Sequence, residues 1–237
     1  MAGLLILASA TFARQALDLE VGYAWPGYLN IRIPGDSGTK FDMTQDLDAE
    51  GTPMFRLRYR YEFGDRHEAA ILIAPLSVKA TGTLDKDVDF DGVMFKKGTR
   101  VEGNYRFDSY RLVYRYLLHD SDHWRISAGA ALKVRDAAVS LEGGGLDSES
   151  DNLGVVPLLS FNVTWTPHPA WSLLLDGEAL AAPQGRAEDI LLACRYQATE
   201  RLLVQAGYRI LEGGADNDDV YTFALFHYAV CGLTWMF

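Results

Sequence analysis

The sequence has few cysteines, no long apolar run and fewer basic than acidic residues. Its 237 residues include two cysteines, and 22 lysines and arginines stand against 32 aspartates and glutamates, for a net charge of −10. A disulfide framework normally uses more cysteines, and a nucleic-acid binder needs a basic face. The longest apolar run, residues 3–10, is shorter than the roughly 20 residues of a transmembrane helix. The sequence therefore argues against all three classes.

The remaining composition looks like that of an ordinary soluble protein. Apolar residues make up 49% of the chain, aromatic residues make up 12%, and the mean hydropathy is −0.05. The aromatic content disfavours disorder, and the length fits one domain or at most two. Because neither a linker nor a repeat is visible, we expect one domain over residues 17–237.

Residues 1–16 form an apolar run followed by small residues, which predicts the end of a secretory signal peptide. Cleavage is expected after Ala10 or Ala13. The basic segment that normally opens such a signal is missing, so we expect the start to be truncated. The alternative is an apolar first strand.

Strict alternation of apolar and polar residues dominates the rest of the chain. Between residues 55 and 63 the odd positions are aromatic or aliphatic and the even positions are charged. A strand separates two such sets onto opposite faces, whereas a helix mixes them. Ten segments behave in this way: 16–26, 53–63, 67–80, 104–118, 123–135, 153–166, 170–181, 188–198, 201–211 and 220–237.

The connections between these segments alternate in length. Tight turns are predicted at 64–66, 119–122, 167–169 and 199–200, and mostly longer loops at 27–52, 81–103, 136–152, 182–187 and 212–219. An even number of antiparallel strands with this layout is typical of an outer-membrane barrel. The predicted fold is all-β: a closed, antiparallel, ten-stranded transmembrane β-barrel with short periplasmic turns and longer extracellular loops.

Two prolines and two cysteines test this strand map. Pro75 and Pro157 each remove a ladder hydrogen bond within a predicted strand, so we expect local bulges there. Cys194 and Cys231 fall two strands apart, at about 10 Å. Disulfide geometry needs Cα atoms within about 7 Å, which predicts two free thiols.

Aromatic placement indicates that the apolar face points outward. Trp124, Trp165, Trp171 and Trp235 lie near the short turns or the C-terminus. Near the long loops lie Tyr23, Trp25, Tyr105, Tyr208, Tyr221 and Phe223. Two aromatic belts around an aliphatic band are expected at the two membrane interfaces, whereas a soluble core has no reason to sort its tryptophans by height.

The chain ends on Phe237, with Trp235 two residues before it and Gly232 earlier in the same segment. This ending resembles the C-terminal strand of bacterial outer-membrane β-barrel proteins, although Val230 stands where that family usually has a polar residue. The resemblance implies recognition by the barrel-assembly machinery through Gly232, Trp235 and Phe237. It also implies a Gram-negative outer-membrane location. Lipid and lipopolysaccharide are the expected surroundings, and we expect a monomer that binds no nucleic acid.

The polar face predicts a charged barrel interior in which basic residues outnumber acidic ones. Arginine or lysine facing lipid costs about 2–4 kcal/mol at the bilayer midplane, so this face must point inward. Its charged residues are Asp18, Glu20, Arg56, Arg58, Arg60, Glu62, Arg111, Arg115, Arg125, Lys133, Arg135, Asp176, Glu178, Asp189, Arg195 and Arg209. The first interpretation is a network of paired charges that fills the lumen. The alternative is a narrow channel or site for small anionic solutes.

An acidic run offers a weaker hypothesis. Asp87, Asp89 and Asp91 have the spacing of the first half of a calcium loop, but Gly98 occupies the position where that loop needs a glutamate. A divalent cation site is one interpretation, and a solvated hairpin is the other. No other cofactor is expected.

Histidine placement disfavours an enzyme. Only His227 falls in the outer half, and its position in the alternation places it on the lipid-facing side. Nearby Asp216, Asp218 and Asp219 leave open a hydrolase at the outer rim, because an Asp/His arrangement there serves the omptin-type proteases. We therefore expect an integral barrel of structural or binding character. The narrow channel is the first alternative and the rim hydrolase the second.

Overall fold

The computed structural model describes residues 14–183 and 185–237, and their regular secondary structure is β. The predicted signal peptide falls mostly outside these residues, although Arg14, Gln15 and Ala16 already belong to the first strand. No described residue lies in a helix that is long and apolar enough to cross a membrane. The strands are β1 (Arg14–Arg32), β2 (Phe41–Asp42), β3 (Asp48–Ala49), β4 (Thr52–Phe63), β5 (His67–Ala74), β6 (Ser77–Thr83), β7 (Val88–Phe90), β8 (Val93–Phe95), β9 (Arg100–Asp120), β10 (Trp124–Gly143), β11 (Leu146–His168), β12 (Trp171–Ala182), β13 (Gly185–Gln197), β14 (Leu202–Asp216) and β15 (Tyr221–Met236).

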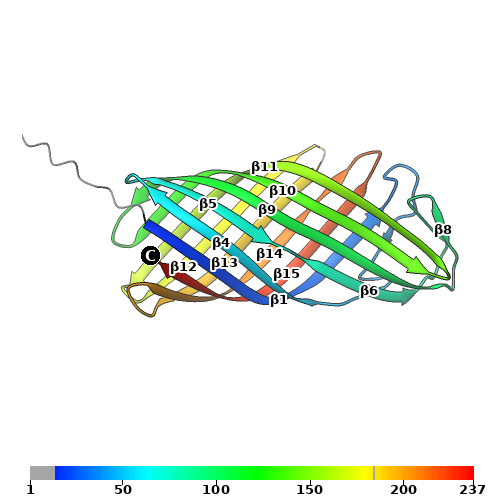
Figure 1. Cartoon of the computed structure of the whole chain (residues 1–237), viewed down its shortest axis with the longest axis horizontal. Helices are drawn as coiled ribbons and strands as arrows, with labels where there is room; N and C mark the ends of the chain where they lie inside the picture. The colour runs from blue at the N-terminus through cyan, green and yellow to red at the C-terminus, as the bar shows by residue number, and fades with distance from the viewer. Residues whose placement is uncertain (1–13, 184) are drawn as a thin grey trace, which may run out of the picture.

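Ten of these units close into a barrel, which confirms the predicted fold class (Figure 1). β1 closes the ring because it pairs antiparallel with both β4 and β15. β5 and β6 count as one wall strand, since both pair with β9. Closure leaves no lone sheet edge at the β1–β15 seam, as a membrane-spanning sheet requires.

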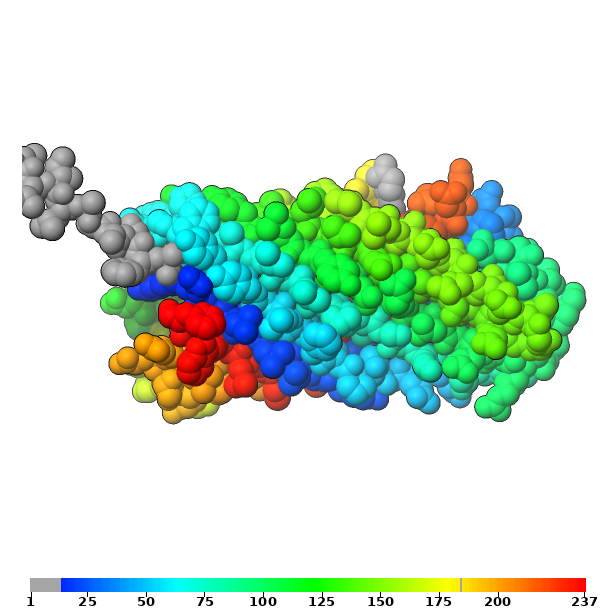
Figure 2. All heavy atoms as spheres, viewed as in Figure 1, coloured from blue at the N-terminus to red at the C-terminus, as the bar shows by residue number. Residues whose placement is uncertain are grey.

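The C-terminus and the start of β1 lie at the end of the barrel that carries the tight turns (Figure 1). By the usual orientation of such barrels this end is periplasmic. The opposite end carries the segments around β2, β3, β7 and β8. Figure 2 shows residues near 84–100 forming the far tip of the molecule.

Several strands are longer than predicted. β9 runs over Arg100–Asp120, and β10 and β11 form a hairpin through what was predicted as the loop 136–152. Gly144 and Gly145 take positive φ values of 62° and 81°, which allow this tight turn. The prediction of a long loop there was wrong.

The bulges predicted at Pro75 and Pro157 are also not found as shifts in strand register. Pro157 pairs with Leu132 without a register shift. Pro75 separates β5 from β6, yet both continue the same register on β9, from Ala74 opposite Ser109 to Ser77 opposite Arg106. Asp108 Oδ1 accepts a hydrogen bond from the backbone N–H of Leu76 at 3.2 Å and so supports the break.

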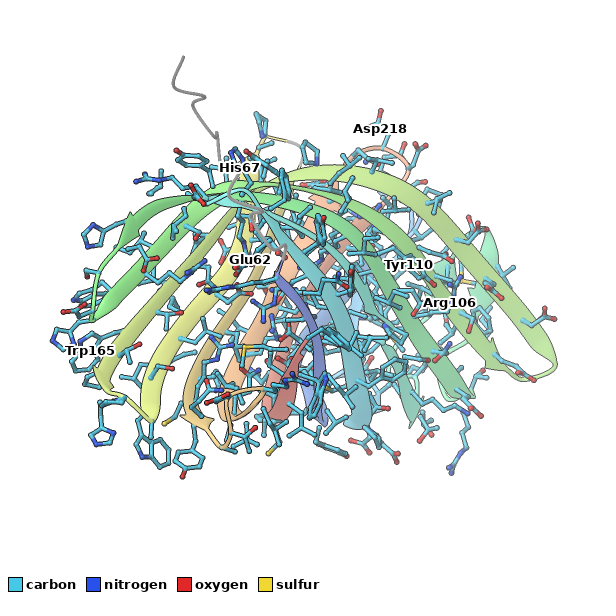
Figure 3. The ribbon with its side chains drawn as sticks, turned by 60° about the vertical axis from the view of Figure 1, so that its left-hand side comes forward. Glu62, His67, Arg106, Tyr110, Trp165 and Asp218 are labelled. Carbon is cyan, nitrogen blue, oxygen red and sulfur yellow. The ribbon has the colours of Figure 1, made fainter. Side chains whose placement is uncertain are left out.

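The outside of the barrel carries a continuous apolar belt. The exposed outward residues include Leu19, Val21, Tyr59, Ile71, Leu112, Leu132, Leu159, Leu192 and Leu233, with Trp124, Trp165, Trp171 and Trp235 near the periplasmic end. Figure 3 shows Trp165 on β11 in this setting. A soluble protein rarely exposes an apolar surface of this extent, whereas lipid requires one.

The belt ends at a defined level on three adjacent strands. The outward face changes from Tyr110 to Asp108 on β9, from Val134 to Asp136 on β10, and from Leu153 to Asp151 on β11. Arg106 Nη1 bridges Asp136 at 2.9 Å and Asp108 at 3.4 Å just above this step. Figure 3 shows Arg106 and Tyr110 following one another along β9. We take this line as the outer boundary of the hydrocarbon.

Beyond the boundary the walls enclose an apolar core. Segments from β1, β6, β9, β10 and β15 surround the loops that carry β2, β3, β7 and β8, and the core includes Leu29, Ile31, Phe41, Met43, Leu47, Val78, Phe90, Phe95, Tyr105, Leu141 and Phe226. Tyr105 belongs to this core and is 4% exposed. Its predicted place in the outer aromatic belt was therefore wrong.

Both cysteines are free, as predicted. Cys194 on β13 lies opposite Ala206 on β14, and Ala206 lies opposite Cys231 on β15. One strand separates the two thiols.

Candidate functional site in the barrel interior

Asp189 on β13 forms the centre of a buried charge cluster. Its Oδ2 accepts hydrogen bonds from Arg56 Nη2 on β4 at 2.9 Å and from Arg111 Nη2 on β9 at 2.6 Å. Its Oδ1 accepts a hydrogen bond from Arg209 on β14. Asp189 is 2% exposed. One carboxylate thus ties together strands from opposite walls.

Asp176 and Glu178 on β12 form a second group. Arg115 Nη1 forms an ion pair with Asp176 Oδ1 at 2.8 Å, and Arg58 Nη1 donates to Asp176 Oδ2 at 3.0 Å. Glu178 pairs with Arg111 and lies 3.5 Å from both Arg58 Nη2 and Arg115 Nη2. Arg111, which binds both Glu178 and Asp189, therefore joins the two groups into one network.

The network reaches β1 through two more carboxylates. Arg209 binds Glu20 with Nε at 2.9 Å and Nη2 at 3.0 Å, which is the bidentate geometry that favours arginine. Arg60 binds Asp18 in the same way, at 2.6 and 3.0 Å. The Thr234 hydroxyl on β15 also donates to Asp18, at 2.5 Å. The barrel interior is cross-linked through its full width.

Neutral side chains complete the hydrogen bonds of these arginines. Arg111 Nε donates to the Ser109 hydroxyl at 3.0 Å, Arg115 Nε donates to the Ser160 hydroxyl at 2.8 Å, and Asn162 Nδ2 donates to Asp176 at 2.9 Å. Sequence reasoning did not single out these three residues. Their shared signal was an inward position in the alternation.

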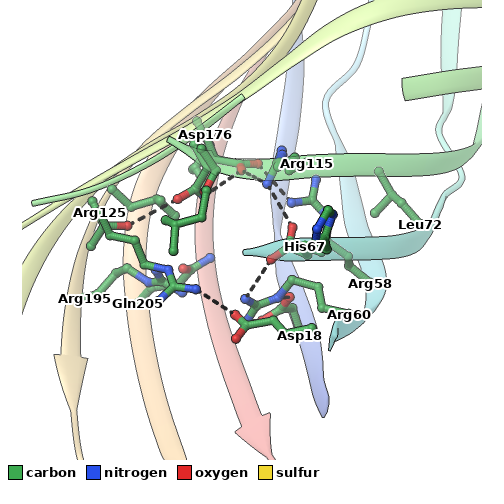
Figure 4. A pocket seen from close by; sticks show the side chains of 18 of the residues that line it. Asp18, Arg58, Arg60, His67, Leu72, Arg115, Arg125, Asp176, Arg195 and Gln205 are labelled. Atoms are coloured by element: carbon green, nitrogen blue, oxygen red, sulfur yellow. Dashed lines mark hydrogen bonds and ion pairs between the residues drawn. The ribbon is translucent and has the colours of Figure 1, made fainter. Parts of the chain in front are cut away.

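A small polar cavity opens from the network toward the periplasmic end. This cavity of about 140 Å³ is lined by Arg58, Arg60, Arg125, Arg195 and other charged side chains (Figure 4). Arg125 is 3.3 Å from Glu62 and 3.4 Å from Asp120, which places its pairing at the rim. Figure 3 shows Glu62 and His67 at this end of the barrel.

Lys133 and Arg135, also predicted as lumen charges, lie outside the network. Lys133 is 3% exposed, with its Nζ 4.5 Å from the centre of the Phe107 ring. Arg135 donates to the Asn152 side-chain oxygen. Within the described ranges, neither residue has a carboxylate within salt-bridge distance. They border a separate cavity of about 560 Å³ on the outer side of the network.

The structure does not gather the three predicted metal ligands into a site. The Asp87 carboxylate accepts hydrogen bonds from Lys96 Nζ at 2.9 Å and from the Lys97 backbone N–H at 2.8 Å. That backbone hydrogen bond, assisted by Lys96, holds the pKa of Asp87 below its usual value. Asp91 lies in the β7–β8 turn with φ at 51°. Residues 14–183 and 185–237 contain no cluster of three potential metal-binding side chains.

His227 lies on the outer surface of β15, opposite Trp25 on β1. Its ring centre is 5.8 Å from that of Trp25, and its Nδ1 shares a hydrogen bond with the Tyr208 hydroxyl at 2.5 Å. This cluster has the composition of an interfacial aromatic girdle. Figure 3 shows Asp218 at the tip of the β14–β15 connection.

The C-terminal strand forms half of the closing seam. The Phe237 backbone N–H donates to the Gln15 carbonyl at 3.0 Å, while the side chains of Trp235 and Phe237 are exposed on the outside. Gly232 lies opposite both Glu20 and Gln205. A Cβ at this position would lie 2.8 Å from Gln205 Cγ on β14, so the close packing of β14 against β15 there favours glycine.

The closed barrel, its apolar exterior and its charged interior define the class: this is an integral bacterial outer-membrane β-barrel protein. No protein-family model matches the sequence, and neither does any curated protein. Among solved structures, the outer-membrane protease OmpT from Escherichia coli matches with a TM-score of 0.59 at 9% identity, covering 94% of this chain and 97% of OmpT. The likeness is one of fold.

Other barrels match less closely. Ail, the attachment invasion locus protein of Yersinia pestis, has a TM-score of 0.41 at 11% identity, with 94% of this chain and 98% of Ail covered. An outer-membrane channel from Pseudomonas putida F1 has a TM-score of 0.43 at 8% identity, with 94% and 95% covered.

Proposed function

We propose that this protein is a non-conducting outer-membrane barrel of binding character. The observation that carries the proposal is the buried ion-pair network, in which side chains from β1, β4, β9, β12, β13 and β14 meet across the lumen. The network acts as a plug, and the protein binds its ligand above it.

Burial and pairing both support a plug. Arg56, Arg111, Arg115 and Arg209 are each 5% exposed or less, as are Asp176, Glu178 and Asp189. A mobile ion would have to displace these paired groups, and removing one partner of a buried pair costs about 3–5 kcal/mol. The narrow channel that the sequence also allowed is therefore the less favoured reading.

Planar-bilayer recording of the refolded protein tests the plug directly. We expect the wild-type protein to be silent. The double variant Arg111→Ala/Glu178→Ala removes a linked cation and anion together and should give discrete conductance steps. Arg125→Ala/Glu62→Ala is the matched control, because it removes a pair at the periplasmic rim and should stay silent. Stable wild-type conductance would overturn the proposal and favour the channel.

We propose further that the C-terminal strand, through Gly232, Trp235 and Phe237, presents the barrel to the assembly machinery, and that the folded protein is a monomer in contact with lipopolysaccharide. The exposed Trp235 and Phe237 side chains at the end of the strand that closes the barrel support this role. Deleting Phe237 should lower the yield of heat-modifiable barrel in cells but leave refolding in detergent nearly unchanged. An equal loss in both settings would point to a purely structural role.

A further inference from the structure

One strand of the barrel wall lacks a neighbour over part of its length. β11 pairs with β10 without interruption from Trp165 opposite Trp124 to Leu146 opposite Gly143. On its other side it pairs with β12 only from Leu159 onward. Residues 146–158 therefore have no ladder partner on the β12 side within the described part of the chain. The shorter β12–β13 hairpin leaves a lateral gap in the wall.

This gap extends into the hydrocarbon. The outward face of β11 changes from Asp151 to Leu153 at the membrane boundary, and Leu153, Val155 and Leu159 are 71%, 62% and 66% exposed. Residues 153–158 thus combine a lipid-facing surface with an unpaired backbone edge. Such an edge is costly against lipid and is tolerated where it is buried in protein or lines a water-filled cavity.

A cavity lies directly behind the gap. Its volume is about 560 Å³, within the range of about 300–1,000 Å³ usual for small-molecule sites. Four consecutive residues of β11, 154–157, line it. These four residues belong to the stretch that has no ladder partner on the β12 side, so the cavity lies beside the unpaired edge. Leu180 and Ala182 of β12 border the other side.

The inner wall of the cavity combines apolar side chains with two cations. Phe107, Leu211, Ala224 and Phe226 supply much of the apolar surface, and Lys133 and Arg135 project from the inward face of β10. Lys133 is buried, and Arg135 Nε is buried without a hydrogen-bond partner among the described residues. A buried cation without an anionic partner is costly, so Lys133, with Arg135 beside it, favours an anion in the site.

The acidic groups around the cavity leave these cations free. Asp151 and Asp219 are exposed at the rim. Glu212 is already bound by Arg186, with Nε at 2.7 Å and Nη2 at 2.6 Å. The positive potential of Lys133 and Arg135 is therefore directed into the cavity.

We infer that this cavity binds one anionic single-chain amphiphile, an alkyl carboxylate, which it takes from the outer leaflet through the gap between β11 and β12. The carboxylate contacts Lys133 and Arg135, and the alkyl chain lies along the apolar wall toward lipid. This inference rests on the proposed binding function and names its ligand class. It does not depend on whether the network conducts.

Photolabelling of the full-length protein in nanodiscs of neutral lipid tests the inference. Hexadecanoate carrying a diazirine near its carboxyl end should label residues 154–157 saturably, because Gly154 and Val156 lie opposite Arg135 and Lys133. Unlabelled hexadecanoate should compete, whereas hexadecanol should compete about tenfold less well, because it lacks the charge that the two cations bind.

Two variants sharpen this experiment. Lys133→Gln/Arg135→Gln should weaken hexadecanoate competition about tenfold or more, while Lys79→Gln, which changes an exposed lysine outside the cavity, should leave it unchanged. Heat-modifiable migration verifies that both variants fold. Labelling that is unsaturable, spread evenly around the belt or insensitive to Lys133→Gln/Arg135→Gln would overturn the inference. Silent bilayers together with such labelling would leave the plug intact and refute only the ligand.

Discussion

The two halves of this barrel use opposite interiors. Within the membrane, the inward positions of β9 carry Arg111 and Arg115, which are buried in ion pairs, while the outward positions are apolar. Beyond Asp108 the inward positions carry Val101 and Tyr105, and the outward ones carry Glu102 and Arg106. The difference follows the solvent: lipid forces charge inward, and water forces apolar side chains inward.

The largest effect is expected when the carboxylate at the centre of the charged half is removed. Asp189→Ala leaves Arg56, Arg111 and Arg209 without their shared carboxylate and should lower the free energy of unfolding by roughly 3–5 kcal/mol. Urea titration of the protein refolded in detergent measures this. Asp219→Ala, on an exposed loop, is the control and should change little. A loss below about 1 kcal/mol for Asp189→Ala would mean that the network is dispensable.

A substitution in the core of the apolar half should destabilise that half and leave the charged half intact. Leu141 is 1% exposed in the outer core, and Leu141→Ala should cost about 2–5 kcal/mol through the cavity it leaves. Hydrogen exchange should rise in the loops around β2, β3 and β7 but not in β12 or β13. Leu146→Ala, at a site that is 44% exposed, is the matched control. Equal loosening of the whole barrel would show that the two halves fold as one unit.

The boundary between the halves can be located on one face of β11. Leu159→Arg places a cation in the lipid belt and should cost about 2–4 kcal/mol if the site lies near the midplane. Asp151→Arg lies on the same face beyond the boundary and should cost no more than about 1 kcal/mol. Unfolding titrations in a common lipid give both values. Similar costs would place the membrane elsewhere.

The smallest effect is expected at Asp87, far from the membrane. Because the folded state lowers the pKa of this carboxyl, its contribution is present above the unfolded value of about 3.9 and is lost as the pH falls through the lower folded value. Amide exchange at Lys97 should therefore accelerate in that acidic window. Asp87→Asn should weaken this pH dependence, while Asp85→Asn should preserve it.

The same contrast explains what sequence could predict. Alternation located the membrane strands because one face was charged and the other apolar. Along β9 the apolar set then changes from even to odd positions near Asp108 and Ser109. The predicted strand 104–118 already spans this reversal, and β9 begins four residues earlier, at Arg100. Beyond the reversal the outer face of the strand meets water instead of lipid.

The candidate site was predictable to a similar extent. The alternation of apolar and charged residues placed Arg56, Arg111 and Asp189 inside the barrel. It could not predict which carboxylate each arginine binds, because that depends on the stagger between distant strands. Nor could it separate Lys133 from the network. The lateral gap arises because β11 extends far beyond β12, and strand length is the property that alternation fixes least well.

The β10–β11 hairpin has a consequence for presenting foreign sequence. It is paired without a register shift up to Gly143 opposite Leu146, and its turn consists of two glycines. From Asp151 to Leu146 the strand rises roughly 17 Å at about 3.4 Å per residue. A peptide inserted between Gly144 and Gly145 would be held at the tip of a rigid two-stranded hairpin, at a fixed height above the bilayer. The hairpin could therefore display an epitope on the cell surface.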